Sequence, residues 1–300
     1  MKAEKLCMLS TAGCLCCLLV VASGCGKRAE GRFKPVRMTW GDADERAPAW
    51  SPDGKLIAYS SNAKSKGDIF YVPAAGGEPV QVTSSEAADD CSCWSPDGKS
   101  IAFHSDREGD ENVWVVDIST GQCRKLTDHP GFDGFPAWNP DGKMILFQSD
   151  GLGNMDIWKM NSDGGDKIPL TTEEELDTTP TWSPDGRSVA FSSRRSGNAD
   201  ICVLDIQSGS LRRLTSDPAD EWRPAWSPDG KKIAFIKSGP GKTAHIWVMD
   251  SDGRNRKRIT FGNCLDYNPS WSPDSGKIAF DSNRGGNRDI WVVELRRVDR

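Results

Sequence analysis

Histidine and tyrosine are scarce in this sequence, and positive charge is not in excess. Three His and three Tyr stand among 300 residues, beside 12 Trp. So few His argue against a His-rich metal centre, and a formal net charge of -5 gives no support for a nucleic-acid binder. Charged residues make up 27% and hydrophobic residues 37%, which argues against a polytopic membrane protein.

Motifs of the common catalytic and metal sites are also absent. The chain holds no Gly-x-Ser-x-Gly, His-Glu-x-x-His or phosphate-loop string. His104, His129 and His245 are far apart in the sequence, and we expect no shared metal site from them. Cys91 and Cys93 are two residues apart and lack further ligands at zinc-site spacing. These absences predict a protein that is not an enzyme and that uses neither a cofactor nor a metal.

One apolar run, from Leu6 to Val21, stands out at the N-terminus and is short for a membrane-spanning helix. It leads into Val-Ala-Ser-Gly-Cys, which resembles the lipobox of bacterial lipoproteins. The resemblance implies a signal peptide over residues 1–24, a lipidated Cys25 and a short tether over residues 25–32. It also implies anchoring in the bacterial cell envelope, at the periplasmic side of the outer membrane in a Gram-negative host. An ordinary cleaved signal peptide is the alternative.

Cysteine usage beyond this segment predicts no disulfide framework. Of ten Cys, four lie in the predicted signal peptide and Cys25 would carry lipid. An odd number then remains, so at least one is unpaired. The remaining cysteines are Cys91, Cys93, Cys123, Cys202 and Cys264.

A repeated string gives the strongest signal in the chain. Trp-Ser-Pro-Asp-Gly, or a near copy, recurs at spacings of 44 residues, with 45 before the last copy. Each copy continues with an alternating apolar run, a polar loop, a second run such as Asp-Ile-Trp-Lys-Met, and a third ending in Leu-Thr or Ile-Thr. Four short strands per copy are typical of a propeller blade. The copies begin at Trp50, Trp94, Trp138, Trp182, Trp226 and Trp271.

The repeats resemble the TolB-type, WD40-like propeller repeat, with its pattern Pro-x-Trp-Ser-Pro-Asp-Gly, Ile-Ala-Phe and Asp-Ile-Trp-Val. The resemblance covers residues 33–295 and implies an all-β, six-bladed propeller of four-stranded antiparallel blades over residues 33–300. The six repeated Trp are then predicted to be buried between blades. Because the sixth copy stops after its third strand, we predict that residues 34–39 supply the missing outer strand and close the ring.

An acidic residue stands five positions before each repeated Trp. Sixfold symmetry would place these acids as a ring at one mouth of the central channel, where they would attract cationic groups. The alternative is that each carboxylate binds backbone groups within its own blade. The six acids are Glu45, Asp89, Asp133, Asp177, Glu221 and Asp266.

The next two positions vary from copy to copy, and variable residues on a fixed scaffold are candidates for binding. The second of them holds Ala47, Cys91, Phe135, Thr179, Arg223 and Asn268. From the loops of this face we predict an aromatic and basic patch suited to a peptide or a sugar, with packing at the blade edges as the alternative. The predicted patch comprises Trp40, Arg46, Trp222, Arg223 and Tyr267.

TolB-like propellers generally act in protein–protein contacts, which the resemblance implies for this chain. The leading hypothesis is therefore a non-enzymatic, monomeric lipoprotein of the cell envelope that presents its channel mouth to a protein or peptide partner. A glycan is the other candidate ligand, and nucleic acid is not expected. The alternatives are a polysaccharide- or cation-binding propeller, and a stand-alone relative of the propeller domain of prolyl-oligopeptidase-type peptidases.

Overall fold

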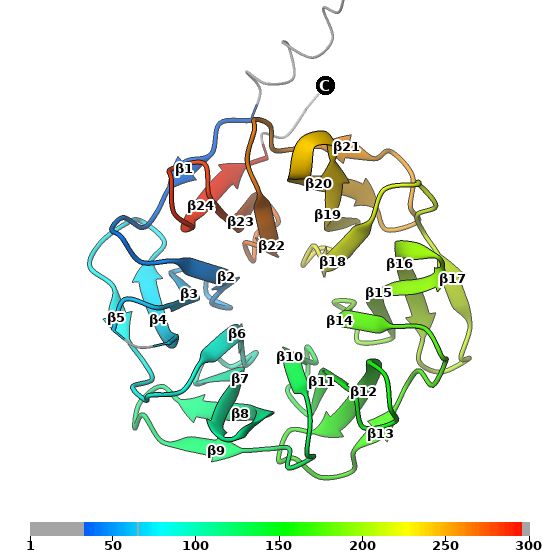
Figure 1. The fold of residues 1–300 in the computed structure, drawn as a ribbon, viewed down its shortest axis with the longest axis horizontal. Coiled ribbons are helices and arrows are strands. Elements are labelled where there is room, and N and C mark those ends of the chain that lie inside the picture. Colours follow the sequence, from blue (N-terminus) through cyan, green and yellow to red (C-terminus); the bar gives the residue numbers. More distant parts are fainter. Residues whose placement is uncertain (1–32, 65, 296–300) are drawn as a thin grey trace, which may run out of the picture.

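Six four-stranded antiparallel sheets surround a central channel in the computed structural model, which describes residues 33–64 and 66–295 (Figure 1). The predicted six-bladed propeller is confirmed. Blades 1 to 3 comprise β2 (Glu45–Trp50), β3 (Leu56–Ser61), β4 (Asp68–Pro73) and β5 (Val80–Gln81); β6 (Asp89–Trp94), β7 (Ser100–Glu108), β8 (Asp110–Asp117) and β9 (Cys123–Lys125); β10 (Asp133–Trp138), β11 (Met144–Ser149), β12 (Asp156–Asn161) and β13 (Ile168–Pro169). Blades 4 to 6 comprise β14 (Asp177–Trp182), β15 (Ser188–Ser196), β16 (Asn198–Asp205) and β17 (Leu211–Arg213); β18 (Glu221–Trp226), β19 (Lys232–Gly239), β20 (Thr243–Asp250) and β21 (Lys257–Arg258); β22 (Asp266–Trp271), β23 (Lys277–Ser282), β24 (Asp289–Glu294) and β1 (Val36–Arg37).

Helical structure in the described residues amounts to one 3-10 turn, η1 (Pro240–Lys242). No helix in this part of the chain has the length and apolar character needed to cross a membrane. The predicted signal peptide, Cys25 and the tether lie outside the described residues. The cysteines at 91, 93, 123, 202 and 264 are all free.

The Ser-Pro-Asp-Gly string forms a tight turn between the first two strands of a blade. In blade 1 the Ser51 hydroxyl donates to the Asp53 carboxylate at 2.7 Å, and the Lys55 N–H donates to the same oxygen at 3.0 Å. These two hydrogen bonds hold the pKa of Asp53 below its usual range. Gly54 has a φ of 71°, a left-handed conformation that glycine adopts without steric cost. The repeated string therefore sets the register of each blade locally.

The hydrophobic core lies between neighbouring blades. Trp94 and Trp271 illustrate the contact, because each indole N–H donates to a carbonyl of the preceding blade, Ala49 at 3.1 Å and Ala225 at 3.0 Å. The predicted burial holds for Trp94, Trp182 and Trp271, whereas the other three repeated Trp are half-buried. One aromatic ring per second strand is almost wholly buried: Tyr59, Phe103, Phe147, Phe191, Phe235 and Phe280.

The N-terminal strand closes the ring as predicted. β1 pairs antiparallel with β24, with Val36 opposite Val292, and the two chain ends of the propeller meet in blade 6 (Figure 1). The Ile290 N–H then donates to the Thr39 hydroxyl at 2.9 Å. The other five blades use a Thr after the outer strand in the same way, namely Thr83, Thr127, Thr171, Thr215 and Thr260.

Candidate functional site

The innermost strand of every blade carries a β-bulge that turns one side chain toward the channel. In blade 1 the pairing with β3 shifts between Arg46 and Ala49, and the other innermost strands shift at the equivalent positions. The bulged residue lies two positions after the acid and has a φ of 50 to 55° in all six blades. These bulged residues are Ala47, Cys91, Phe135, Thr179, Arg223 and Asn268.

The left-handed conformation is unfavourable for residues with a Cβ, and most of all for β-branched Thr179. Side chains of the preceding blade help to hold it. The Thr179 N–H donates to the Gln148 amide oxygen at 2.8 Å, and the Arg223 N–H donates to the Ser192 hydroxyl at 3.0 Å. With the bonds from Ala47 to Asp281 and from Phe135 to His104, four of the six strained positions are fixed by contacts between blades.

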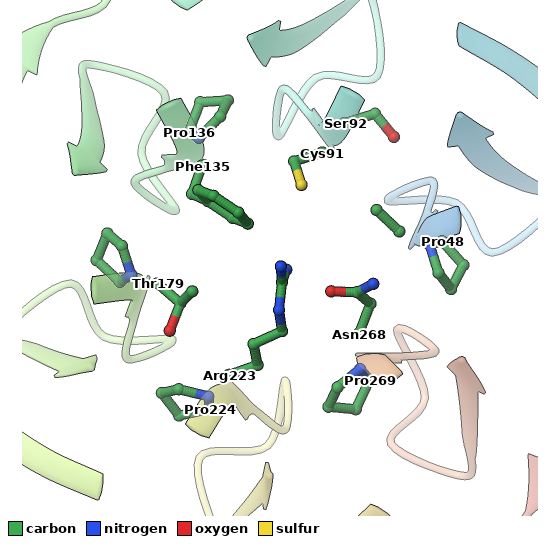
Figure 2. Close-up of a pocket in the computed structure, with 12 residues that line it drawn as sticks. Pro48, Cys91, Ser92, Phe135, Pro136, Thr179, Arg223, Pro224, Asn268 and Pro269 are labelled. Atoms are coloured by element: carbon green, nitrogen blue, oxygen red, sulfur yellow. The ribbon is translucent and has the colours of Figure 1, made fainter. Parts of the chain in front are cut away.

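These bulged residues line a channel pocket of about 140 Å³, together with the residues that follow them. Figure 2 shows the Cys91, Phe135, Thr179, Arg223 and Asn268 side chains converging on the channel axis from different blades. Five of the six positions are followed by Pro, which fixes the local backbone. The pocket is below the usual size of a small-molecule site and suits one side chain or end group.

Arg223 supplies the charge in this pocket. Its guanidinium carbon lies 4.5 Å from the centre of the Phe135 ring, a cation–π contact. Among the described residues, no carboxylate lies within ion-pair distance of this guanidinium. Asp90 and Asp281 lie near enough to interact with its charge, and the Cys91 side chain contacts it. A guanidinium has five N–H donors, so donors remain at the channel axis for an anionic group.

The six predicted ring acids are not open to the channel mouth, which corrects that prediction. Each begins an innermost strand and is at most 7% exposed. Arg107 binds both oxygens of Asp89, at 2.8 and 2.7 Å, and Arg284 binds Asp266 at 2.6 Å. Asp177 pairs with Arg195, and Glu221 with Lys237. Four of the carboxylates are thus held within their own blade, by side-chain cations rather than by the backbone groups of the alternative interpretation.

Two of the six acids lack such a cation. In blades 1 and 3 one carboxylate oxygen of Glu45 and one of Asp133 is buried without a hydrogen-bond partner. Burial raises the pKa of Asp133, and it raises the pKa of Glu45 to about 7. The Thr39 hydroxyl and Arg37 oppose the rise at Glu45 only in part.

Replacing Glu45 with Gln should flatten the pH dependence of stability. Glu45 titrates near 4.5 in an ordinary setting and at about 7 here, so the folded state holds more protons between these values. Wild-type stability therefore falls as pH rises through that window, by about 1–3 kcal/mol after allowing for partial access of water. Urea unfolding near pH 5 and near pH 8 measures this fall, which Glu45→Gln should reduce. Exposed Glu78→Gln is the control, and an unchanged slope in Glu45→Gln would contradict the assignment.

The predicted aromatic and basic patch is not one surface. Arg223 enters the channel pocket, whereas Trp222 and Tyr267 pack against the core between blades 5 and 6. Arg46 is exposed and pairs with Asp44, at 2.9 Å. Packing at the blade edges, the alternative interpretation, therefore fits Trp222 and Tyr267.

Trp40 lies apart from the other residues of the predicted patch. It is 66% exposed and lines a separate cavity that reaches Glu45. The β-bulge of each innermost strand, in contrast, explains why the neighbours Trp222 and Arg223 direct their side chains to different places, the first to the core between blades and the second to the channel pocket.

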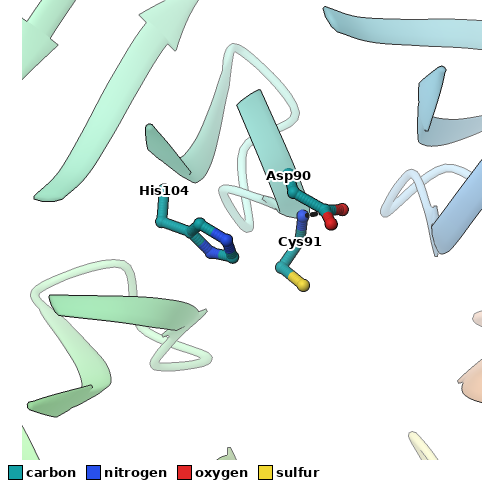
Figure 3. Close-up of side chains that lie close together, drawn as sticks. All are labelled: Asp90, Cys91 and His104. Atoms are coloured by element: carbon teal, nitrogen blue, oxygen red, sulfur yellow. Dashed lines mark hydrogen bonds between the residues drawn. The ribbon is translucent and has the colours of Figure 1, made fainter. Parts of the chain in front are cut away.

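Cys91 has ligand-type neighbours that the sequence spacing does not reveal. Pairing of β6 with β7 places Asp90 opposite His104, and Figure 3 shows both side chains beside Cys91. One candidate ligand atom from each lies within 4.8 Å of the others. The sequence spacing around Cys91 and Cys93 did not reveal these neighbours, which come from the facing strand and the adjacent position. Sulfur, imidazole and carboxylate are ligands that zinc accepts, so these residues could hold such an ion.

The Asp90 and His104 side chains of this cluster already accept hydrogen bonds within the protein. Asp90 accepts from the Ser60 hydroxyl and the Cys91 N–H, both at 2.6 Å, and His104 Nδ1 accepts weakly from the Phe135 N–H at 3.4 Å. Burial raises the pKa of the Cys91 thiol. These three residues can therefore also serve a structural role, as a buried hydrogen-bonded network without a metal ion.

A second cluster, His245, Cys264 and Asp266, is fully buried in blade 5 and blade 6. His245 Nδ1 lies 3.1 Å from Asp266, which Arg284 also binds. His245 pairs with Lys237 at the place where other blades have Asp or Asn, as the repeat register predicts. Its contacts are those of a structural network in which Arg284 supplies the positive charge.

Solved structures resembling this chain include TolB proteins. The protein assigned as TolB in Agrobacterium tumefaciens is 26% identical, with a TM-score of 0.71, over 88% of this chain and 97% of its own. TolB from Acinetobacter baumannii is 26% identical, with a TM-score of 0.68, over 85% of this chain and 65% of its own. A gluconolactonase from Xanthomonas campestris shares the fold at 15% identity and a TM-score of 0.66, over 90% of this chain and 92% of its own.

No curated protein matches the chain significantly. The family model described as the TolB beta propeller domain matches residues 47–222 and again residues 179–299. These matches cover well over half of the sequence and follow the repeats that build blades 1 to 6. The chain therefore belongs to the TolB β-propeller family.

Proposed function

We propose that this chain is a non-enzymatic binding protein of the bacterial cell envelope, anchored by lipid at Cys25, that receives an acidic group of a protein or peptide partner in its channel pocket. Membership of the TolB β-propeller family and the lipobox-like string support the envelope setting. Propeller channels and their mouths are frequent binding sites, because loops and strand ends of all blades converge there.

Arg223 is the observation that carries this proposal. Its guanidinium contacts the Phe135 ring, and none of the ion pairs within 4.0 Å among the described residues includes it, although Asp90 and Asp281 interact with its charge from further away. Desolvating an arginine is costly unless an acceptor arrives, so a carboxylate from a partner would complete the site. A pocket of about 140 Å³ has room for an acidic side chain or a C-terminal carboxylate. This size favours a peptide group over an extended polysaccharide.

The non-enzymatic part of the proposal has a separate support. Catalysis by Cys91 would require a thiolate, and burial favours the protonated thiol instead. The sequence contains no Ser elbow of the prolyl-oligopeptidase type. The cation-binding alternative would draw on the six ring acids, which are buried, and four of which pair with a cation of their own blade.

Arg223→Met should weaken capture of the partner by about tenfold or more, because a charge-assisted hydrogen bond contributes about 1.5–3 kcal/mol. The full-length chain with a C-terminal tag is used to capture proteins from envelope extracts, with quantitative mass spectrometry as the readout. Arg212→Met is the matched control, since Arg212 is exposed in β17 and should leave capture unchanged. Equal capture by wild type and Arg223→Met, or no enrichment by wild type, would contradict the proposal.

A further inference from the structure

In four blades a cation binds the buried acid and lies over at least one aromatic ring. In blades 2 and 6 the cation contacts two rings, one from the second strand and one from the third strand. In blade 2 the Arg107 guanidinium binds Asp89, and its central carbon lies 5.1 Å from the Phe103 ring centre and 4.8 Å from that of Trp114. The guanidinium is thus held between a carboxylate and two aromatic faces. Such an arrangement stabilises a cation by hydrogen bonding and by cation–π attraction.

The same arrangement recurs around the ring. In blade 6 Arg284 binds Asp266 and lies 5.1 Å from the Phe280 ring centre and 5.4 Å from that of Trp291. Blades 4 and 5 use Arg195 and Lys237, which also lie over aromatic rings. Each of the three arginines stands 18 positions after its acid.

Blade 1 has the walls of this site without its cation. Glu45 is the buried acid, and Tyr59 pairs with Phe70 as Phe103 pairs with Trp114 in blade 2. The position 18 residues after Glu45 holds Ala63, whose side chain is too short to reach the carboxylate. No cation of this blade therefore pairs with Glu45, and one of its oxygens is buried without a hydrogen-bond partner.

A cavity of about 460 Å³ occupies this place, within the usual range for a ligand site. Glu45, Tyr59, Ala63 and Phe70 line it, and Trp40 adds an indole that is 66% exposed. The cavity therefore lies beside a carboxylate that has one oxygen without a hydrogen-bond partner, is lined by aromatic rings, and reaches solvent beside Trp40.

Blade 3 provides the contrast within the same chain. It also lacks the cation, because Gly151 stands at that position. The His129 ring lies 3.6 Å from where a Cβ of residue 151 would be, so another side chain occupies the space. Blade 1 is thus distinguished by a cavity beside an acid that has no cation of its own blade.

We infer that the cation site of blade 1 binds the guanidinium group of an arginine side chain supplied by another protein, with Glu45 as the anion and Tyr59, Phe70 and Trp40 as the aromatic walls. Arginine is favoured over lysine because three of the four filled sites use it, and because a planar guanidinium matches both the carboxylate and the ring faces. This site is separate from the channel pocket and does not involve Arg223. Its failure would leave the proposed function standing.

Calorimetric titration of the full-length chain with N-acetyl-arginine methylamide tests the site, with the neutral isostere N-acetyl-citrulline methylamide as the matched probe. We expect the arginine probe to bind with a dissociation constant of about 1 mM, a contact of roughly 4 kcal/mol, and at least tenfold more tightly than the citrulline probe. Glu45→Gln should weaken binding of the arginine probe at least tenfold. Equal binding of the two probes, or no binding of either, would overturn the inference.

Filling the site from within the chain gives an independent test. Ala63→Arg should abolish binding of the arginine probe and raise the melting temperature, because it places a cation where blades 2, 4 and 6 have one. Ala75→Arg is the matched control, since Ala75 is exposed in the turn that follows β4 and should leave binding and melting temperature unchanged. Retained probe binding in Ala63→Arg would place the probe elsewhere and reject the inference.

Discussion

Deleting residues 33–40 is expected to abolish the folded propeller at physiological temperature. The segment supplies the outer strand of blade 6 and buries Phe33 and Met38, and truncating such side chains costs about 2–5 kcal/mol each. It also removes the Thr39 hydroxyl bond to Ile290 and the ion pair of Arg37 with Asp289 at 2.7 Å. The combined loss approaches the whole stability of an ordinary domain, about 5–15 kcal/mol.

Circular dichroism melting and limited proteolysis measure this effect. Two single substitutions in the same segment test how much individual side chains contribute to it. Met38→Ala should lower stability by about 2–4 kcal/mol because it empties a buried position. Val36→Ala is the control in the same segment, since Val36 is 60% exposed and should change stability little. A deletion variant that melts like the wild type would show that ring closure does not depend on β1.

Arg107→Met is expected to destabilise the protein by about 3–5 kcal/mol, because it leaves a buried carboxylate without its partner. Asp89 is fully buried, and Arg107 binds both of its oxygens. The expected fall in melting temperature is roughly 10 °C for a chain of this size. The same substitution also removes the contacts of the guanidinium with Phe103 and Trp114.

The double variant Asp89→Asn with Arg107→Met separates charge from packing. Asp89→Asn removes the buried charge that Arg107→Met leaves without a partner, so the double variant should regain much of the lost stability. The effects of the two substitutions on the free energy of unfolding in urea should therefore be strongly non-additive. Arg212→Met, an exposed arginine, should stay within about 0.5 kcal/mol of wild type. A loss below about 1 kcal/mol in Arg107→Met would mean that the acids are not held by their cations, and it would return the acidic ring to consideration as a binding feature.

The architecture could be predicted almost completely from the sequence because its determinants are local. Ser-Pro-Asp-Gly closes its own turn through hydrogen bonds between residues two to five positions apart, as in Ser51, Asp53 and Leu56. The repeat spacing then fixes the number of blades. Even the closing strand followed from local reasoning, because the sixth copy lacks the Leu-Thr run that residues 34–39 supply.

The candidate site was predicted less well, because side-chain direction there depends on the bulge. Trp222 and Arg223 are neighbours in sequence, yet one enters the core between blades and the other enters the channel. The acids were expected at an open mouth, but all six are buried, and cations 16 to 18 positions further along the chain hold four of them inside the blades. One sequence signal existed in retrospect, since Ser-x-Arg recurs at 105–107, 193–195 and 282–284 and is broken at Ala63.

The sequence by itself determined the all-β class, the six blades, their register and the closure of the ring, because turns and alternating strands are specified within each repeat. Only the tertiary structure decided which polar groups are satisfied, because their partners come from other strands and from neighbouring blades. It buried the six acids, directed Arg223 to the channel axis and joined Cys91 to Asp90 and His104. It also left Glu45 without a cation of its own blade. The effect of having Ala at position 63 instead of Arg becomes visible only when the residues around the cavity are placed in three dimensions.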